Sequence, residues 1–313
     1  MKVFLNCIFA VMSVLAGLSL YSHIAATEIE ASHPPTGSFI RLDTSQLHVV
    51  KEGKGPALVL IHGATTTLYD FTASIFEPLA EHCQVLALDR PGHGYSSYPD
   101  TYWLDPEQQA IVIHQALQQI GIEQSVWVGH SWGGSVVMAG LLRYPGHVSS
   151  GVLLGGAAYP WQGGVDWSNH MADTPIVGPL ITRTLLIPTG LMLMDSAINE
   201  VFYPDSPPQD YRQETAIELI LRPDHFTVNG RDVRYLSQFL EKQSLRYSAI
   251  RQPVLIIHGE DDDIVPAWNH ADRLIKVLPN AILEELPRTG HAPHHTQQGL
   301  VVELIKQFAC EMN

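Results

Sequence analysis

The stretch from Val126 to Gly134 constrains the fold of this chain more than any other. It begins as an apolar run that suits a buried strand, passes through Gly129, Ser131 and Gly133, and continues into a run with helical character. Small residues on both sides of a serine allow a tight, strained turn between strand and helix, and such a turn lifts the hydroxyl group clear of the sheet. The N–H groups at the start of the following helix point toward any negative charge that develops beside the serine. The motif therefore predicts a strand–turn–helix unit with Ser131 as a nucleophile.

Length and composition favour one large globular domain with an insertion. The chain has 313 residues, of which 45% are hydrophobic and 16% charged, and these values suit a fold with a large core. Its formal net charge is −14 and it contains no basic run, whereas proteins that bind nucleic acids cluster lysine and arginine against phosphates. The sequence therefore argues against a nucleic-acid partner, and we expect a small-molecule substrate.

The first 26 residues form a segment of their own. One positive charge, at Lys2, precedes an apolar run over residues 3–20, and small residues follow up to Ala26. This order is typical of a secretory signal peptide, although the run is also close to the length of a membrane-spanning helix. We expect a signal peptide that is cleaved near Ala26, with an uncleaved anchor in residues 1–26 as the alternative, and a polar tether over residues 28–37. Both alternatives predict a catalytic domain outside the cytoplasm, either exported to the periplasm or beyond, or attached to the membrane.

Two cysteines, Cys83 and Cys310, lie in the part of the chain that follows this segment. Two cysteines so far apart in sequence do not form the pattern of a disulfide framework. We expect two buried thiols, and a single bridge between them is the alternative.

Strand-like and helix-like segments alternate over residues 57–156. Apolar runs without polar alternation suit parallel strands that are covered on both faces, and here they are separated by amphipathic segments such as 69–81 and 106–120. Such alternation requires crossover helices between parallel strands. Before it, residues 38–42 and 46–51 favour a hairpin at the edge of the sheet. The sequence predicts an α/β fold with a mostly parallel, doubly wound sheet.

The alternation then stops, and residues 159–250 hold no convincing buried strand apart from residues 185–187. This segment is rich in Pro, Trp, Met and Tyr, and we interpret it as a helical cap insertion that packs over the sheet. The alternation resumes with a strand over residues 253–258. The remaining expected elements are a helix over residues 268–278, a strand over 281–286 and a helix over 298–310.

Two loops after expected strands carry the partners that a serine nucleophile requires. A base must accept the serine proton, and a carboxylate must orient the base. The first loop contains Asp261, Asp262 and Asp263, and the second contains His291. Open α/β sheets hold their sites at the edge where the carboxyl ends of the strands meet. The chain order Ser, Asp, His therefore predicts a catalytic triad at that edge.

These motifs resemble those of the α/β-hydrolase superfamily, in the branch that carries a cap between the two halves of the sheet. The resemblance extends over residues 38–310. Four blocks carry it: residues 60–64, residues 89–96, residues 129–134, and residues 259–266 together with Gly290 and His291. It implies a division into a signal peptide or anchor at residues 1–26, a first core part at 38–158, the cap at 159–250 and a second core part at 251–313.

The resemblance also assigns roles to single residues. In the family pattern G-x-x-D-x-x-x-P, the loop that ends at Pro266 places the triad acid at Asp262. His291 is then the base, and the backbone N–H groups of Ala64 and Trp132 form the oxyanion hole. Asp261 and Asp263, the neighbours of Asp262, are expected to be solvated.

Histidines near the expected site raise the question of a metal. His294 and His295 follow His291 closely, but their spacing fits no firm metal-binding pattern. We therefore expect no metal and no cofactor. The resemblance makes His62 and His130 structural residues beneath the site.

The function that these motifs and the resemblance favour is a serine hydrolase that cleaves carboxylic esters through an acyl-enzyme. Apolar residues of the insertion suggest an apolar ester, and they include Trp161, Trp167, Met192, Leu193, Phe202 and Tyr203. Packing of the insertion against the core is the alternative role for these side chains.

Two other functions share these motifs. The same triad supports hydrolysis of a carbon–carbon bond or peracid formation. A carboxylate-bearing substrate would then need a cation, and the insertion offers Arg183, Arg222, Arg231 and Arg234. A ligand-binding receptor on the same fold is the alternative from another class, because fold alone does not determine function.

Overall fold

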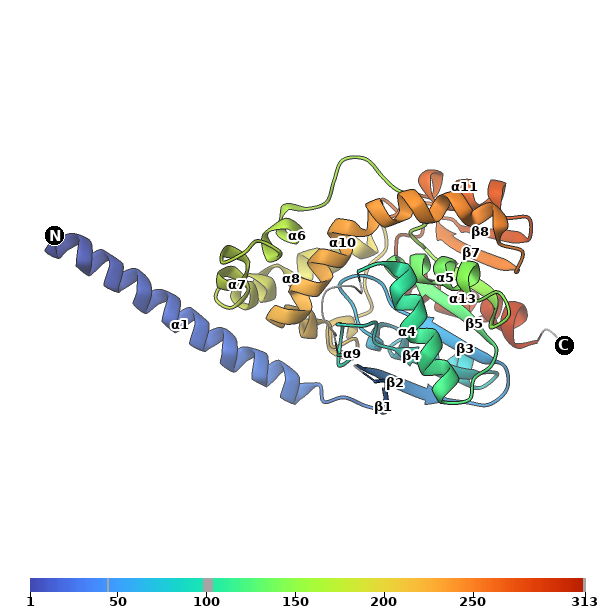
Figure 1. Ribbon diagram of the computed structural model, residues 1–313, viewed down its shortest axis with the longest axis horizontal. Coiled ribbons are helices and arrows are strands. Elements are labelled where there is room, and N and C mark those ends of the chain that lie inside the picture. Colours follow the sequence, from blue (N-terminus) through green and yellow to red (C-terminus); the bar gives the residue numbers. More distant parts are fainter. Residues whose placement is uncertain (44, 98–103, 312–313) are drawn as a thin grey trace.

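The computed structural model describes residues 1–43, 45–97 and 104–311. A single eight-stranded sheet, in the order β1-β2-β4-β3-β5-β6-β7-β8, forms its centre, with helices on both faces (Figure 1). The strands are β1 (Ser38–Arg41), β2 (Gln46–Glu52), β3 (Ala57–Ile61), β4 (Gln84–Leu88), β5 (Ser125–His130), β6 (Val148–Leu154), β7 (Val254–Gly259) and β8 (Ala281–Leu286). β2 pairs antiparallel with both β1 and β4, and every other neighbouring pair is parallel. The prediction of a mostly parallel α/β sheet with an edge hairpin is confirmed.

The central strands are buried on both faces because helices cover each side of the sheet. All residues of β5 and β7 are buried. One face packs against α4 (Pro106–Gln119), α5 (Trp132–Arg143) and α11 (Ala271–Val277), and the other against α2 (Tyr69–Thr72), α3 (Phe76–Ala80) and α13 (Gln298–Ile305). Continuous apolar strands fit this two-sided burial. The shorter elements near the carboxyl end are η3 (Ala267–Asn269), α12 (Pro293–Thr296) and η4 (Lys306–Cys310).

The single helix expected over residues 69–81 is two short helices, α2 and α3. At the break, the Ser74 hydroxyl donates to the carbonyl of Asp70 at 2.8 Å, and the Ser74 N–H bonds to Phe71. A serine that bonds to the carbonyl four residues back competes with the regular helix. The expected helix over residues 268–278 is likewise divided, into η3 and α11.

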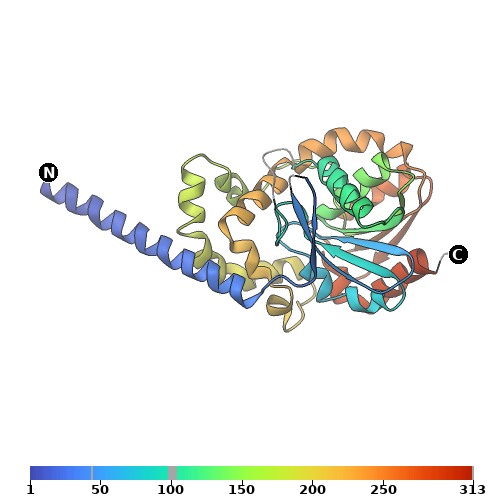
Figure 2. The same ribbon diagram turned by 60° about the horizontal axis from the view of Figure 1, so that its bottom comes forward.

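The insertion between β6 and β7 lies entirely within the described residues, and its regular elements are all helices, joined by loops (Figure 2). Its elements are α6 (Trp167–Ala172), α7 (Val177–Thr182), α8 (Leu186–Phe202), α9 (Tyr211–Glu214), η1 (Ile217–Leu221), α10 (Pro223–Gln243) and η2 (Ser244–Ala249). Residues 185–187, the one candidate for a strand, lie at the start of α8 instead. Pro188 follows in the first turn of that helix, where its missing N–H has no helical acceptor to lose.

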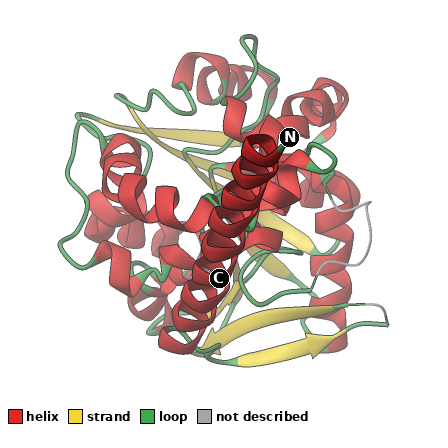
Figure 3. Cartoon of the chain, turned by 90° about the vertical axis from the view of Figure 1, so that its left-hand side faces the viewer, coloured by secondary structure: helices red, strands yellow, loops and turns green. Residues whose placement is uncertain are grey.

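The amino-terminal segment is one uninterrupted helix, α1 (Lys2–Ser32), which projects from the rest of the molecule (Figures 1 and 3). It is long and apolar enough to cross a membrane. Its carboxyl-terminal part packs on the insertion and buries Ser22, Ala25 and Ile29. The polar tether expected from residue 28 is therefore wrong up to Ser32, because residues that face the insertion at helical spacing extend the helix.

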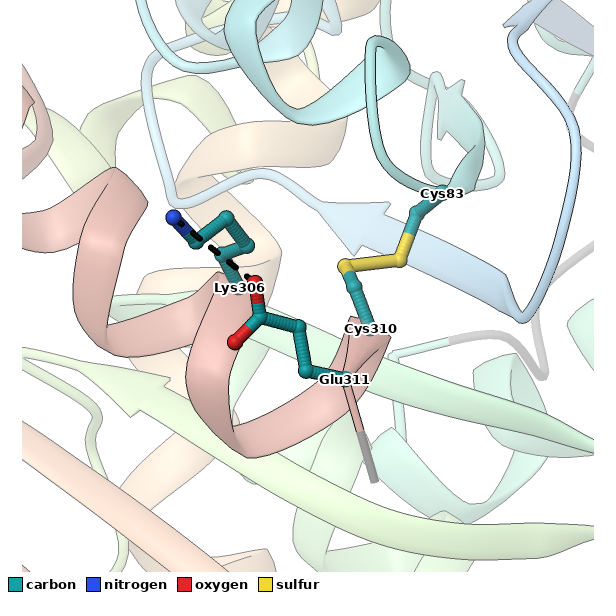
Figure 4. The surroundings of a disulfide bond; sticks show 4 residues. All are labelled: Cys83, Lys306, Cys310 and Glu311. Atoms are coloured by element: carbon teal, nitrogen blue, oxygen red, sulfur yellow. Dashed lines mark ion pairs between the residues drawn. A yellow bond between two sulfur atoms is a disulfide. The ribbon is translucent and has the colours of Figure 1, made fainter. Parts of the chain in front are cut away.

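Cys83 and Cys310 form a disulfide bond that joins the chain before β4 to the end of η4 (Figure 4). The expectation of two free thiols is wrong, and the alternative of a single bridge is correct. The two residues are 227 positions apart in sequence, so only the folded arrangement brings them together. Cys7 in α1 is the free cysteine of the described chain.

We expect removal of the disulfide to destabilise the protein by about 2–4 kcal/mol, because the bond restricts the unfolded chain over a long loop. The variant is Cys83→Ser combined with Cys310→Ser, and the measurement is the free energy of unfolding in urea without reductant. Cys7→Ser is the control and should leave this free energy unchanged. Equal stability of the double variant and the wild type would contradict a stabilising role for the bond.

Candidate active site

Ser131 lies at the sharp turn between β5 and α5. Its backbone adopts φ 51° and ψ −118°, a left-handed conformation that costs energy for any residue with a side chain. The turn needs glycine on both sides, because a Cβ on Gly129 would overlap the carbonyl of Gly133, and one on Gly133 would overlap the carbonyl of Ile61. The local sequence thus folds as predicted and presents a serine hydroxyl at the amino-terminal end of a helix.

Asp262 and His291 come together at the same edge of the sheet. His291 Nδ1 lies 2.8 Å from Asp262 Oδ2, and the other carboxylate oxygen accepts the N–H groups of Ile264 and Val265 at 3.0 and 2.8 Å. Burial alone would raise the pKa of Asp262, but His291 and the Val265 N–H lower it overall. Asp262 is therefore ionised at neutral pH and holds His291 with its Nδ1 proton directed at the carboxylate. Its neighbours Asp261 and Asp263 are exposed, as expected.

Beneath His291 lies a buried polar cluster. His130 Nε2 donates to the backbone carbonyl of His291 at 3.0 Å. Behind it, Asp70 accepts His294 Nε2 at 3.0 Å and His295 Nε2 at 2.9 Å. Asp70 was not predicted, because it lies in α2, far from the histidines in sequence.

Asp70, His294 and His295 are the group of described residues whose types and positions could hold a metal ion, with ligand atoms within 4.8 Å of one another. The separations of 2.9 and 3.0 Å are those of N–H···O hydrogen bonds. The cluster therefore satisfies its buried carboxylate with its own imidazole donors.

A buried arginine, Arg90, shapes the loop that carries Ala64. Its Nε donates to the His62 carbonyl at 3.0 Å, and its Nη2 donates to the Gly63 carbonyl at 3.1 Å. The Arg90 backbone N–H also bonds to His62 Nε2 at 2.9 Å. The backbone and the guanidinium group of Arg90 therefore both bind this loop. Ala64 follows directly and lines the same cavity as Ser131 and Trp132. Trp132 is the first residue of α5 and has no helical acceptor for its N–H.

The same arginine connects this loop to the insertion. Arg90 forms an ion pair of 2.6 Å with Asp232 of α10, and both side chains are fully buried. Its guanidinium group lies 4.1 Å from the ring centre of Trp132, and the Trp132 indole donates to the Asp232 carbonyl at 3.1 Å. Asn229, one turn earlier in α10, accepts the Thr65 N–H at 2.7 Å. Arg90 belongs to the motif at residues 89–96, but nothing in the sequence indicated which residues of α10 it contacts.

A cavity of about 1020 Å³ opens in front of Ser131. Its walls are mostly apolar and come from the insertion and from the loop after β7; they include Trp161, Val165, Phe226, Leu236, Ile264 and Trp268. Of the insertion residues suggested as walls, Trp161 lines the cavity. Trp167, Met192 and Leu193 are exposed, and Phe202 is buried inside the insertion. Tyr203 lines a smaller neighbouring hollow together with His291, and Ile264 lines both spaces.

The four arginines suggested as carboxylate ligands lie outside the lining of this cavity. Arg231 and Arg234 both pair with Asp173, and Arg222 pairs with Glu30 of α1. Arg183 lines a separate surface hollow. Arg273 is the cation in the cavity wall, and it lies over the Tyr159 ring at 3.7 Å and donates to Asn269 at 2.8 Å.

We expect His270, in the cavity wall, to make the stability of the fold depend on pH. Its Nδ1 accepts the N–H groups of Ala158 and Tyr159 at 3.0 and 3.2 Å, and burial lowers the pKa of His270 from 6.5 to about 4. Between these pH values the unfolded chain binds a proton that the folded chain does not, so stability falls as the pH falls. This residue alone should remove about 3 kcal/mol of unfolding free energy on acidification from above pH 6.5 to about pH 4.

Urea unfolding across this pH range measures that loss, with His270→Asn as the comparison. The asparagine Oδ1 can accept the same backbone N–H groups but does not titrate. We expect the variant to lose less stability on acidification than the wild type. Parallel losses in the two proteins would contradict the assignment.

Comparison with known proteins identifies the family. The family model of the alpha/beta hydrolase fold matches residues 56–298, so the chain belongs to this family of hydrolases. An uncharacterized hydrolase of Bacillus subtilis, YugF, is 28% identical, and the match covers 80% of this chain and 89% of that protein. A 2-hydroxy-6-oxononadienedioate/2-hydroxy-6-oxononatrienedioate hydrolase of Burkholderia vietnamiensis is also 28% identical, over 79% of this chain and 84% of that protein.

Solved structures share the fold at lower identity. An alpha/beta hydrolase fold protein from Burkholderia ambifaria matches with a TM-score of 0.72 and 22% identity, over 86% of this chain and 97% of that one. A membrane phospholipase A, described as a bacterial virulence factor, matches with a TM-score of 0.66 and 20% identity, over 98% of both chains. These likenesses establish the arrangement of sheet and helices, and the named activities belong to those proteins.

Proposed function

We propose that this protein is a serine hydrolase that cleaves carboxylic esters through an acyl-enzyme. The observation that carries the proposal is the arrangement of three features at one edge of the sheet. Ser131 occupies a strained turn at a helix start, His291 is bound to a buried carboxylate at 2.8 Å, and an apolar cavity opens in front of the serine. In this proposal Ser131 is the nucleophile, His291 the base and Asp262 the orienting acid.

The proposed reaction depends on which nitrogen of His291 carries the proton. Asp262 engages Nδ1 of His291, which leaves Nε2 to accept the Ser131 proton as the serine oxygen attacks the ester carbonyl. The backbone N–H groups of Ala64 and Trp132 stabilise the oxyanion, and one such donor contributes about 2.7–4 kcal/mol in a serine protease. His291 then returns the proton to the departing alcohol. Water, deprotonated by His291, attacks the acyl-enzyme and releases the acid and the free serine.

The cavity favours an apolar, uncharged acyl group. Its walls are dominated by aliphatic and aromatic side chains, and its arginine, Arg273, is already engaged by Tyr159 and Asn269. Carbon–carbon hydrolysis of a carboxylate-bearing substrate is the second candidate, and relatives with that activity favour it. The engagement of Arg273 argues for the ester.

We also propose that residues 159–250 act as a cap domain between core parts at 38–158 and 251–313. For residues 1–26 we propose a retained anchor, the alternative to the cleaved signal peptide that the sequence led us to expect. Cleavage near Ala26 would remove Ser22 and Ala25, which pack on the insertion. Lys2 at the amino terminus favours a cytoplasmic start by the positive-inside rule. The disulfide between Cys83 and Cys310 suits an oxidising compartment. Together these observations support a catalytic domain held outside the cytoplasm.

Two measurements on the full-length protein test the proposed chemistry. The first is mass spectrometry after reaction with a fluorophosphonate probe, and the second is turnover of p-nitrophenyl esters from acetate to palmitate. We expect a label on Ser131 and fast turnover of at least one ester. A label without turnover of any ester would overturn the esterase and favour carbon–carbon hydrolysis or a receptor. No label on Ser131 would overturn the nucleophile.

A further inference from the structure

The position along α1 at which the helix contacts the insertion indicates how close the insertion would lie to a membrane that α1 crosses. Residues 3–20 extend over about 27 Å at the rise of an α-helix, close to the ~30 Å of a bilayer core. Ser22 is the first residue of α1 that is buried, and its hydroxyl donates to the Thr184 carbonyl at 2.9 Å. Thr184 connects α7 to α8. If residues 3–20 cross a membrane, as proposed above, this connection lies at the depth of the lipid headgroups.

The helices on either side of this connection expose apolar side chains. The exposed fractions are 84% for Ile176, 44% for Val177, 47% for Leu180, 42% for Leu185, 77% for Met192 and 59% for Leu193. Soluble proteins scatter such residues singly, whereas these six lie in or directly before α7 and α8, and α8 packs against α1. Figure 1 shows α7 and α8 at the end of the molecule from which α1 projects.

The exposed charged residues of α8 and of the connection before it are also unevenly distributed. Arg183 is exposed between Leu180 and Leu185, where its guanidinium group can reach lipid phosphates while its aliphatic stem stays among apolar side chains. The exposed acids Asp195 and Glu200 lie in the second half of α8, beyond Met192. The longest run of exposed apolar side chains on the insertion is therefore the one nearest the contact between Ser22 and Thr184, whereas Trp167, Tyr203 and Leu245 are exposed singly elsewhere on it.

We infer that the exposed faces of α7 and the first half of α8 dock into the headgroup and acyl boundary of the membrane that α1 enters. The inference rests on the proposed anchor. A bilayer is the occupant that the geometry favours, because the apolar surface begins at the level where the apolar part of α1 begins to run free of the protein. A second copy of this chain is the competing occupant.

Docking in this orientation would bring the cavity close to its substrate. α6 packs against α7, and Ser168 and Asn169 of α6 line the cavity in front of Ser131. Trp167 in the same helix is 69% exposed, and tryptophan is the side chain most typical of membrane interfaces. The ester that suits this site is an amphiphile that resides in the bilayer.

The test uses the full chain in phosphatidylcholine vesicles that contain phosphatidylglycerol. In a Cys7→Ser background, an environment-sensitive fluorophore is attached at one of three positions through Met192→Cys, Val14→Cys or Gln118→Cys. Met192 reports the docking surface, Val14 the anchor, and Gln118 an exposed site on α4. The readout is quenching by lipids with a nitroxide on the acyl chain. We expect quenching at positions 192 and 14 and none at 118.

The outcomes separate the inference from the proposed anchor. Quenching at position 14 without quenching at 192 overturns the docking surface and leaves the anchor intact. No quenching at position 14 overturns both. A fluorescence change at 192 that depends on protein density rather than on nitroxide lipid overturns the bilayer in favour of a second copy.

A functional arm uses Leu180→Glu and Met192→Glu, which lie outside the cavity lining. If the surface docks, hydrolysis of an ester embedded in vesicles should fall by about tenfold, the effect expected from losing one buried apolar side chain. Hydrolysis of a water-soluble short ester should stay within about twofold. If both variants hydrolyse the vesicle-embedded ester as fast as the wild type does, docking as a route to substrate is overturned.

Discussion

Replacement of Ser131 by alanine should lower kcat for the best ester by about 10⁵- to 10⁶-fold, because no other group in the proposed site can form the acyl-enzyme. The substitution keeps the Cβ and therefore makes the same steric demands in the turn at φ 51°. We expect the free energy of unfolding to change by less than about 1 kcal/mol. The two measurements are steady-state turnover and urea unfolding of the same preparation.

Ser135→Ala is the matched control for this prediction. Ser135 lies one helical turn further along α5, is fully buried, and donates to the Trp132 carbonyl at 2.6 Å. Its removal should cost about 1 kcal/mol of stability for the lost hydrogen bond, while turnover stays close to that of the wild type. Substantial ester hydrolysis by Ser131→Ala would refute the assignment of the nucleophile.

The elements that sequence predicted well are those whose evidence is local. The turn at Ser131 depends on glycines two residues away on either side, and strand β3 follows from one continuous apolar run. Parallel order follows from alternation of such runs with helices. The resemblance then led to the pair Asp262 and His291, which the structure places 2.8 Å apart.

What sequence did not predict depends on contacts between distant segments. Asp70 meets His294 and His295 across more than 200 residues, and Cys83 meets Cys310 across 227. No periodicity or spacing reports such pairs, because nothing between them fixes their separation. The interior of the insertion was equally hidden, so most of the aromatic and aliphatic residues suggested as cavity walls proved to lie on its surface or in its own core.

The buried ion pair between Arg90 and Asp232 leads to the second large expected effect. Arg90→Met should lower the free energy of unfolding by about 3–5 kcal/mol, because it leaves the Asp232 carboxylate buried without its partner. Burial raises the pKa of Asp232 to about 6 even beside Arg90, which shows how strongly this site disfavours an isolated charge. Urea unfolding at neutral pH measures the loss.

Arg231→Met is the control for a charge pair in the same helix. Arg231 pairs with Asp173 at 2.6 Å, but its side chain is 35% exposed, and exposed pairs contribute about 0–1 kcal/mol. A further variant combines Arg90→Met with Asp232→Leu, which removes both charges. Replacing a whole buried pair by apolar side chains is often neutral, so we expect this double variant to recover most of the lost stability.

The same variants distinguish the effect of the ion pair on stability from its effect on the geometry of the active site. Arg90 also holds the carbonyls of His62 and Gly63, which precede Ala64. The double variant should therefore regain its fold but keep a lowered kcat, since the loop that offers the proposed oxyanion donor has lost its anchor to the insertion. Full recovery of kcat together with stability would show that the ion pair supports folding alone. Failure of Arg90→Met to destabilise more than Arg231→Met would mean that Asp232 finds another partner or is not buried in solution.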